Sequence, residues 1–243
     1  MRLKIVLECA SDIKLPRDYN YILQSSIYKF MEERIPNLHS LGMEINNRKL
    51  RPFVLSKIYG KYDVVNGGIC FKSPISIYIA SPVDEIIKGI GNQYFNDTCM
   101  KLLDYELKPV EISVLNPKIE KDSIRVKTLS PITVRSTLET KDGKKKSYFY
   151  NPYEKDFQQQ IKENLIRKYK SLGNEVTEEE FNFRTIGTAK QRISKYKGFV
   201  IVAWDGTFEM SGNKELLNLA FNWGLGSRNA QGFGMITEQL NKK

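Results

Sequence analysis

Apolar and polar residues along the first half of the chain follow two periods, one typical of strands and one of helices. Residues 3–9 alternate between apolar and charged side chains, which is typical of a half-buried strand. Residues 19–34 carry apolar side chains at helical spacing, which predicts an amphipathic helix with Asp18 as its N-cap. The apolar face of this helix is expected to consist of Leu23, Ile27, Phe30 and Met31.

Further strand patterns and a second helix complete this half. Strands are expected at residues 53–58, 68–72, 75–79 and 110–115. The helix is expected at residues 81–95, with Pro82 near its first turn, where proline is tolerated. The order strand, helix, strand, strand, helix, strand is ferredoxin-like. We therefore place an N-terminal domain at residues 1–117, before a polar linker with one proline.

The same alternation of strands and helices restarts after the linker. Helices are expected at residues 153–172, ending at Gly173, and from an N-cap at Asn213 to Trp223. Strand patterns lie at residues 124–134, 147–150, 185–192, 198–204, 207–211 and 235–238. We predict an α+β fold of two tandem ferredoxin-like (βαββαβ, RRM-like) domains, the second at residues 123–243.

Charge narrows the classes of partner. The 243 residues carry a formal net charge of +10, and the excess is uneven. Residues 123–243 hold 21 Lys and Arg against 13 Asp and Glu, whereas residues 1–122 hold 17 against 15. A polyanion is the simplest partner for such a surface, and the second half is expected to bind most of it.

Other signals in the sequence are weak but agree. Cys9, Cys70 and Cys99 are odd in number and widely spaced, which favours reduced thiols over a disulfide framework or a zinc site. The start of the chain is too charged for a signal peptide, and no apolar run approaches the roughly 18 residues of a membrane span. We therefore expect a soluble, cytoplasmic protein with no membrane partner and no metal or other cofactor.

The most specific segment is Gly-Leu-Gly-Ser-Arg-Asn-Ala-Gln-Gly-Phe-Gly at residues 224–234. Four glycines allow positive φ and a close backbone approach, so that N–H groups can face a phosphate while Arg228 adds charge. The alternative is a helix end followed by a hairpin with no ligand. The order helix, loop, strand excludes a dinucleotide-binding fingerprint, and no phosphate-loop Gly-Lys-Ser/Thr is present.

This segment resembles the glycine-rich loop of the repeat-associated RNA-binding superfamily of CRISPR systems, and within it the Cas family six endoribonucleases. The segments at 51–58 and 129–132 are similar to that family's "F-x-x-S" and "S-P-I" strands. The resemblance implies that the chain binds CRISPR repeat RNA and cuts precursor guide RNA without a metal. The ribose 2′-OH would attack the adjacent phosphate, leaving a 2′,3′-cyclic phosphate and a 5′-OH end.

The resemblance also implies the catalytic residues. His39, the single histidine of the chain, follows the first helix where the family places its catalytic histidine, and its ordinary pKa near 6.5 suits proton transfer. Tyr28 is the favoured helix tyrosine, with Tyr21 as the alternate. Lys49 is the favoured cation, and its rivals are Arg48, Arg51 and Lys29.

The remaining candidates concern RNA binding. In the glycine-rich loop they are Gly224, Gly226, Ser227, Arg228, Gln231, Gly232 and Gly234. Lys144 and Lys145 lie at a basic hairpin tip, whose alternative role is a solvated turn. Lys190, Arg192 and Lys195 alternate along a strand in a pattern that suits successive phosphates, with Tyr196 available for stacking.

Two other functions remain open at this point. One is a non-catalytic RNA-binding subunit of a CRISPR effector complex, which would share the glycine-rich loop. The other is a general RNA-binding protein, against which the absence of an RNP1-like aromatic motif argues. The resemblance also allows a homodimer and contacts with other CRISPR effector subunits.

Overall fold

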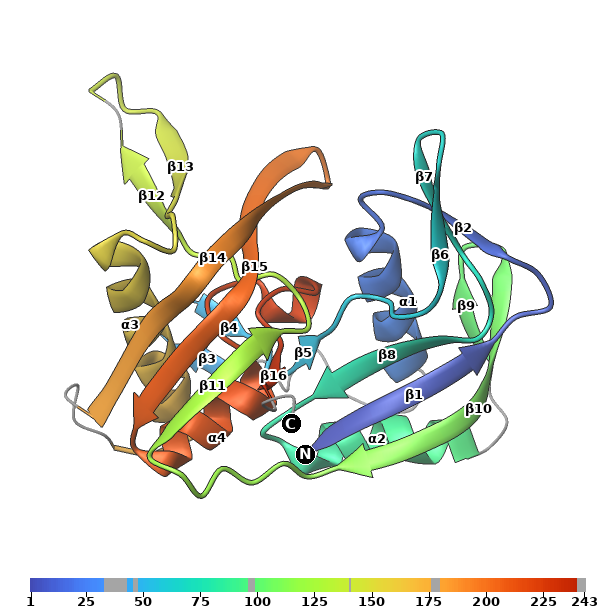
Figure 1. Ribbon diagram of the computed structural model, residues 1–243, viewed down its shortest axis with the longest axis horizontal. Coiled ribbons are helices and arrows are strands. Elements are labelled where there is room, and N and C mark those ends of the chain that lie inside the picture. The colour runs from blue at the N-terminus through green and yellow to red at the C-terminus, as the bar shows by residue number, and fades with distance from the viewer. Residues whose placement is uncertain (33–42, 46–47, 96–98, 140, 176–179, 240–243) are drawn as a thin grey trace.

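The computed structural model describes residues 1–32, 43–45, 48–95, 99–139, 141–175 and 180–239, with the backbone alone for residues 32, 43–45, 48–49 and 93–95. Two β-sheets lie side by side, each with two helices behind it (Figure 1). His39, the predicted catalytic histidine, falls outside the described residues.

The N-terminal sheet is antiparallel in the order β5-β8-β1-β10-β9. Its strands are β1 (Arg2–Glu8), β5 (Val54–Leu55), β8 (Ile75–Ala80), β9 (Met100–Leu102) and β10 (Tyr105–Leu115). Its helices are α1 (Asn20–Glu32) and α2 (Asp84–Phe95). Apart from the added edge strand β9, each helix follows and precedes a strand as a ferredoxin-like domain requires.

The C-terminal sheet repeats this arrangement in the order β14-β15-β11-β16. Its strands are β11 (Ser123–Thr128), β14 (Phe181–Tyr196), β15 (Phe199–Gly212) and β16 (Ile236–Glu238). Its helices are α3 (Lys155–Ser171) and α4 (Lys214–Trp223). In both sheets the first strand lies between the third and the last, so the predicted fold of two tandem ferredoxin-like domains is confirmed.

Short strands are inserted between the elements of this repeated pattern. They are β2 (Ile13–Pro16), β3 (Met43–Ile45), β4 (Arg48–Leu50), β6 (Tyr62–Val65), β7 (Gly68–Phe71), β12 (Arg135–Glu139) and β13 (Lys145–Phe149). The hairpins β6–β7, β12–β13 and β14–β15 all project from the upper side of the molecule in Figure 1. The sequence predicted the β12–β13 turn but gave no indication of β2, β6 or β9.

Local sequence explains the helices well. The apolar face of α1 is buried as predicted, and the face of α4 that includes Leu216 and Phe221 enters the C-terminal core. Asn213 caps α4, since its side chain accepts hydrogen bonds from the N–H groups of Glu215 and Leu216. Asp18 lies two residues before the first residue of α1, and its carboxylate accepts a hydrogen bond from the N–H of Lys195 at 2.8 Å.

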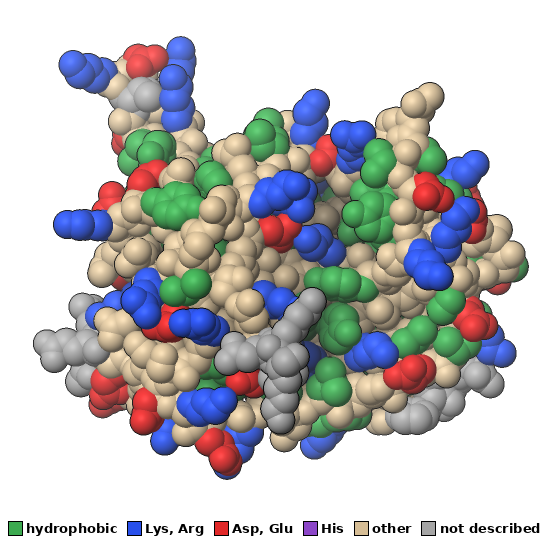
Figure 2. Space-filling model, in the orientation of Figure 1, with side chains coloured by type: hydrophobic (Ala, Val, Ile, Leu, Met, Phe, Trp, Pro, Cys, Tyr) green, Lys and Arg blue, Asp and Glu red, His purple; other side chains and the backbone are tan. Residues whose placement is uncertain are grey.

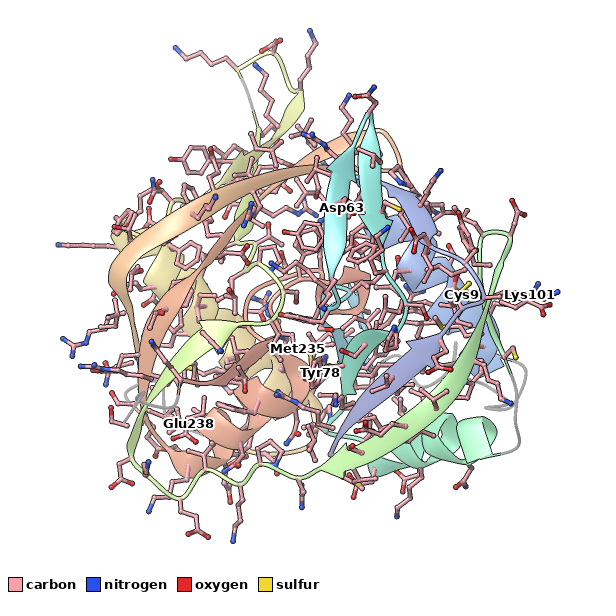
Figure 3. The ribbon with its side chains drawn as sticks, turned by 45° about the vertical axis from the view of Figure 1, so that its right-hand side comes forward. Cys9, Asp63, Tyr78, Lys101, Met235 and Glu238 are labelled. Carbon is pink, nitrogen blue, oxygen red and sulfur yellow. The ribbon has the colours of Figure 1, made fainter. Side chains whose placement is uncertain are left out.

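The two halves meet along β5 and β16. Val54, Ala80, Leu129 and Met235 form a small buried cluster there, and Figure 3 shows Met235 and Tyr78 close to this junction. The expected strand at 53–58 is short because the chain leaves the sheet, and the N–H of Lys57 pairs with Leu129 O instead. This junction fixes the two sheets against each other and places the site described below.

No strand or helix is present between β10 and β11, at residues 116–122, where the linker was expected; the domain boundary itself stays a prediction. Within the described residues, no helix has the length and apolar character needed to cross a membrane.

Candidate functional site

The glycine-rich loop, residues 224–234, connects the end of α4 to β16. All four of its glycines have positive φ, between +66° and +84°. A Cβ on Gly226 would lie 2.5 Å from Thr133 O, and a Cβ on Gly234 would lie 2.0 Å from Leu225 O. The loop therefore needs glycine both for its backbone conformation and for close packing, as the sequence predicted.

Hydrogen bonds join this loop to both halves of the molecule. The N–H of Ser227 donates to Thr133 O at 2.9 Å, which ties the loop to the segment after β11. On the other side, Asn20 at the start of α1 donates from Nδ2 to Gln231 O at 3.4 Å. Inside the loop, the Asn229 amide donates to Leu225 O and Phe233 O, each at 3.0 Å. The loop is thus held at the contact line between α1 and the C-terminal domain.

A cavity of about 470 Å³ opens beside the loop and is rich in arginine; we call it the arginine cavity. Its lining consists of Leu50, Arg51, Arg135, Asn164, Arg167, Lys168, Trp223, Gly226, Ser227, Arg228, Asn229, Ala230 and Gln231. Burial, and next the nearby Arg135, lower the pKa of Arg228. Since the described lining contains four arginines and no carboxylate, an anion is the ligand that would relieve this repulsion.

Tyr28 lies next to this cavity. The Arg51 guanidinium lies over the Tyr28 ring at 4.9 Å from its centroid, and the Phe53 ring packs against it at 5.4 Å. Burial raises the pKa of Tyr28 to about 12, against the opposing effect of Arg51. The Tyr28 hydroxyl is therefore protonated at neutral pH, so it can donate a proton or a hydrogen bond but cannot act as a base.

The alternate tyrosine lies elsewhere. Tyr21 is 41% exposed, packs edge-on against Tyr196 at 5.5 Å, and has Lys197 Nζ over its ring at 4.9 Å. It lines neither of the cavities that involve the glycine-rich loop. Tyr28 does not line the arginine cavity either, but it contacts Arg51, which does, whereas Tyr21 contacts Tyr196 and Lys197 instead.

The cation candidates divide in a similar way. The backbone of Lys49 lies in β4, and the side chains of Lys49 and Arg48 are outside the described residues. Leu50 and Arg51, the next two residues, line the arginine cavity, and β3 contacts α3 of the other domain. Lys29 is exposed on α1 and does not line the cavity. Among the described candidates, Arg51 is the one that the fold brings to Tyr28.

A second cavity, of about 390 Å³, lies between the β6–β7 and β14–β15 hairpins; we call it the aromatic cleft. It is lined by Arg17, Tyr19, Asn20, Lys57, Ile58, Tyr59, Gly60, Tyr62, Ile69, Phe71, Pro131, Arg192, Ile193, Ser194 and Phe233. Figure 2 shows the hollow near the centre of one face, with Lys and Arg on its left and apolar side chains on its right. Tyr62 is 58% exposed there and presents its ring to solvent.

One carboxylate, that of Asp205, binds two of the cations that line the aromatic cleft. Asp205 on β15 accepts from Lys57 Nζ at 3.0 Å and from Arg192 Nε at 2.7 Å, which fixes both cations at the wall. Lys190 and Lys195 are exposed on the same strand as Arg192. Tyr196 was expected to be available for stacking, but it is buried against Phe233, so that prediction was wrong.

The tip of the β12–β13 hairpin carries two of the predicted RNA contacts. Lys144 and Lys145 are exposed at the end of β12–β13, and Lys144 Nζ lies 3.4 Å from an oxygen of Asp142. Neither lysine lines a cavity described above. Both stay predicted RNA contacts.

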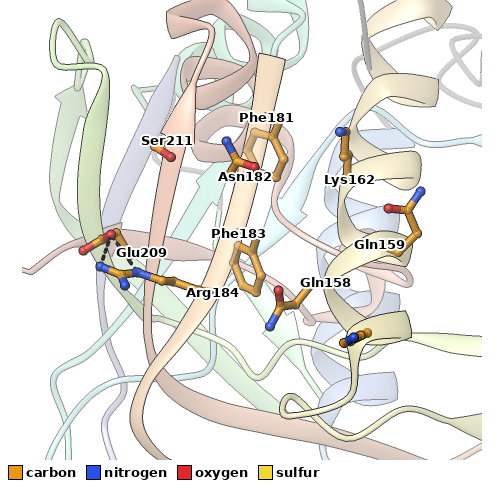
Figure 4. Close-up of a pocket in the computed structure, with 10 residues that line it drawn as sticks. Gln158, Gln159, Lys162, Phe181, Asn182, Phe183, Arg184, Glu209 and Ser211 are labelled. Atoms are coloured by element: carbon orange, nitrogen blue, oxygen red, sulfur yellow. Dashed lines mark hydrogen bonds and ion pairs between the residues drawn. The ribbon is translucent and has the colours of Figure 1, made fainter. Parts of the chain in front are cut away.

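A third hollow, between α3 and β14, is separate from the glycine-rich loop (Figure 4). Polar side chains such as Gln158 and Asn182 line it, and Arg184 is paired there with Glu209 at 2.6 Å. Phe181 and Phe183 form its floor but are buried. We assign no role to this hollow.

Sequence reasoning missed Arg135, Arg167, Lys57 and Tyr62. Arg135 and Tyr62 lie in hairpins inserted between the core elements, and Arg167 lies on a helix with many charged residues. The one available signal for Arg135, Lys57 and Tyr62 was that they lie in or near the "S-P-I" and "F-x-x-S" segments, and Arg167 had no such signal. Among the described residues, no three His, Cys, Asp or Glu side chains gather as metal ligands would.

The chain thus combines two tandem ferredoxin-like domains with a glycine-rich loop and an arginine-lined cavity at their contact line, whose charge suits an anion. The family model "CRISPR associated protein Cas6, C-terminal" matches residues 114–238. The chain belongs to the Cas6 family.

Relatives cover nearly the whole chain. "CRISPR-associated endoribonuclease Cas6 1" of Methanocaldococcus jannaschii is 26% identical, covering 100% of this chain and 96% of that protein. "CRISPR-associated endoribonuclease Cas6" of Pyrococcus furiosus is 28% identical, covering 94% and 85%. The solved structure of a Cas6-related protein from Pyrococcus furiosus is 26% identical, with a TM-score of 0.87 and coverage of 100% and 99%.

Proposed function

We propose that this chain is an endoribonuclease that binds CRISPR repeat RNA and cleaves precursor guide RNA. The observation that carries the proposal is that Arg51 and Arg228 both line the arginine cavity beside the glycine-rich loop, with the ring of Tyr28 packed against Arg51. Two relatives that span the chain are named CRISPR-associated endoribonucleases, which supports the same reaction class.

The proposed reaction is a transesterification within the RNA. The 2′-oxygen attacks the adjacent phosphorus and its proton passes to a base, while the bond from phosphorus to the 5′-oxygen breaks and that oxygen takes a proton from an acid. The products are a 2′,3′-cyclic phosphate and a 5′-OH end. The reaction as proposed needs no metal, because guanidinium groups can stabilise the charge of the phosphorane.

Each side chain then has a defined part. Arg51 and Arg228 stabilise the dianionic phosphorane in the arginine cavity. Tyr28, whose pKa is raised to about 12, donates a hydrogen bond or proton and does not serve as the base. His39 is the proposed proton-transfer group and Lys49 an added cation; both keep the roles that the family resemblance implies.

The RNA is proposed to reach this site along the aromatic cleft. Arg17, Lys57 and Arg192 offer charge to phosphates there, and Tyr62 offers an exposed ring to a base. The glycine-rich loop connects the two sites, because Gln231 lines the arginine cavity while Phe233 lines the cleft. Lys190, Lys195, Lys144 and Lys145 extend the proposed contact to the hairpins.

The deciding experiment is cleavage of 5′-labelled repeat RNA in EDTA, with a 2′-deoxy substitution at the cut site as substrate control. Wild type is expected to cut the RNA and to leave the 2′-deoxy substrate intact. His39→Ala and Tyr28→Phe are expected to bind RNA but to cut it roughly 10²–10⁴-fold more slowly, the usual contribution of a general acid or base. Lys101→Met, on the exposed face of β9 and outside both cavities, is the matched control.

Cleavage that appears only when a divalent metal is restored would contradict the proposed mechanism. Tight binding by wild type with no cleavage under any condition would favour the alternative, a non-catalytic repeat-RNA-binding subunit of a CRISPR effector complex.

A further inference from the structure

One lysine beside the glycine-rich loop is almost fully buried. Lys168 lies on the side of α3 that faces the loop and is 2% exposed. Its Nζ lies 2.7 Å from Gly224 O, 3.3 Å from Gly226 O and 2.7 Å from Asn229 Oδ1, and it also lies 3.5 Å from Trp223 O. A single ammonium group thus contacts the end of α4, the start of the loop at Gly226 and the Asn229 side chain in its middle.

The partners of Lys168 are all neutral oxygens. Trp223 and Gly224 end α4, where unpaired carbonyl groups carry partial negative charge and attract a cation. The Trp223 ring adds a cation–π contact at 5.9 Å. Burial, and next Arg167, lower the pKa of Lys168 well below its ordinary value. Burying an ammonium group costs free energy, and the hydrogen bonds from Lys168 to the loop and to the end of α4 offset that cost.

The loop depends on Lys168 and Asn229 together. Asn229 Oδ1 accepts from Lys168, and the amide nitrogen of the same side chain donates to Leu225 O and Phe233 O. These contacts surround Ser227 and Arg228, the residues between them that line the arginine cavity. Arg228 itself has a φ of +60°, a conformation that few non-glycine residues adopt.

We propose that Lys168 is the positioning residue of the glycine-rich loop, whose buried ammonium holds Ser227 and Arg228 in place to receive an RNA phosphate without contacting the RNA itself. The inference rests on the proposed binding of repeat RNA at this loop. It differs from a phosphate-binding role, which would require an accessible ammonium group.

The test uses three variants of the full chain. Lys168→Met removes the ammonium at similar side-chain length, Arg228→Met removes a proposed phosphate ligand, and Lys170→Met removes an exposed lysine at the end of the same helix. Repeat-RNA affinity is measured over a range of salt concentrations, with thermal unfolding to establish that each variant is folded.

Lys168→Met is expected to lose RNA affinity about tenfold or more, with the slope of log Kd against log salt unchanged. Arg228→Met is expected to lose affinity and to reduce that slope by about 1, and Lys170→Met to bind within about twofold of wild type. A purely structural lysine would lower the unfolding temperature of Lys168→Met and leave the affinity of the folded protein as it was.

If Lys168→Met folds and binds RNA with wild-type affinity, the proposal is overturned. It is also overturned if Lys168→Met reduces the salt slope as Arg228→Met does, since Lys168 would then be a phosphate ligand. If Lys168→Met does not fold, Lys168→Gln keeps a hydrogen-bond donor and is expected to fold and lose affinity several-fold; wild-type affinity there would also overturn it. If wild type itself does not bind repeat RNA, the proposed function fails, which is a different outcome from any of these.

Discussion

The arginine cavity and the aromatic cleft share the glycine-rich loop as a wall but differ in the chemistry of their other walls. Among the described residues, four arginines and Lys168 line the first, and Trp223 is the one aromatic residue there. Five aromatic side chains line the second, and two of its cations are paired with Asp205. Guanidinium groups suit phosphate, whereas rings suit bases, so the two cavities are suited to different parts of one nucleotide chain.

The largest effect is expected where the two cavities share their wall. Gly234→Ala would place a Cβ 2.0 Å from Leu225 O at a φ of +82°, so we expect a loss of about 3 kcal/mol or more in the free energy of unfolding. RNA binding should be lost along with it. Urea unfolding and filter binding measure the two effects. Gly143→Ala is the control, since Gly143 has a φ of +73° but open space around it, and should cost about 1–2 kcal/mol and leave binding intact.

Substitution of arginines in the arginine cavity should reduce the salt dependence of RNA binding. In the double variant Arg51→Met with Arg135→Met, each substitution is expected to weaken RNA binding by roughly 1.5–3 kcal/mol, because each removes a charge-assisted contact to phosphate. The slope of log Kd against log salt should fall by about 0.7–0.9 per arginine. An unchanged slope in the double variant would mean that the RNA backbone does not enter this cavity. Lys101→Met again serves as the control.

Substitution in the aromatic cleft should weaken RNA binding without changing its salt dependence. Tyr62→Ala is expected to weaken binding by roughly 1–3 kcal/mol through the loss of one stacked base, with the salt slope unchanged. Val64→Ala in the same hairpin removes an exposed apolar side chain that does not line the cleft, and it should bind as wild type does. If both variants bind equally well, stacking on Tyr62 plays no part.

The smallest effect concerns Tyr19 in the wall of the cleft. Burial raises the pKa of Tyr19 to about 12 in the folded chain, above the ordinary value near 10. The unfolded chain ionises first, so this stabilising contribution is complete below pH 10 and is lost as the pH rises towards 12. We expect a loss of about 1 kcal/mol at pH 11. Urea unfolding at pH 8 and pH 11 measures it.

Tyr19→Phe provides the comparison for that measurement. It removes the titrating group together with the hydrogen bond that the hydroxyl accepts from the N–H of Ile58 at 3.2 Å. Tyr19→Phe should therefore be less stable than wild type at pH 8 and should lose less between pH 8 and pH 11. An equal loss in both proteins would assign the alkaline effect to other groups.

Several elements followed from the sequence because their determinants are local. The apolar face of α1, the Asn213 cap of α4 and the β12–β13 turn depend on residues a few positions apart. The long strands β14 and β15 were predicted only in pieces. Their register shifts between Ile186 and Lys190, near Gly187 with its φ of +67°, and this interruption breaks the alternation that marks a strand.

The sequence by itself determined the two ferredoxin-like repeats, the excess of positive charge and the glycine-rich loop, because periodicity, composition and glycine spacing are written in consecutive residues. Only the tertiary structure decided that Tyr28 and not Tyr21 lies next to the arginine cavity, that Arg51, Arg135 and Arg228 converge there, and that Tyr196 and Lys168 are buried. Burial and the meeting of like charges depend on which elements pack together, and that packing joins residues as far apart in sequence as Arg2 and Ile236.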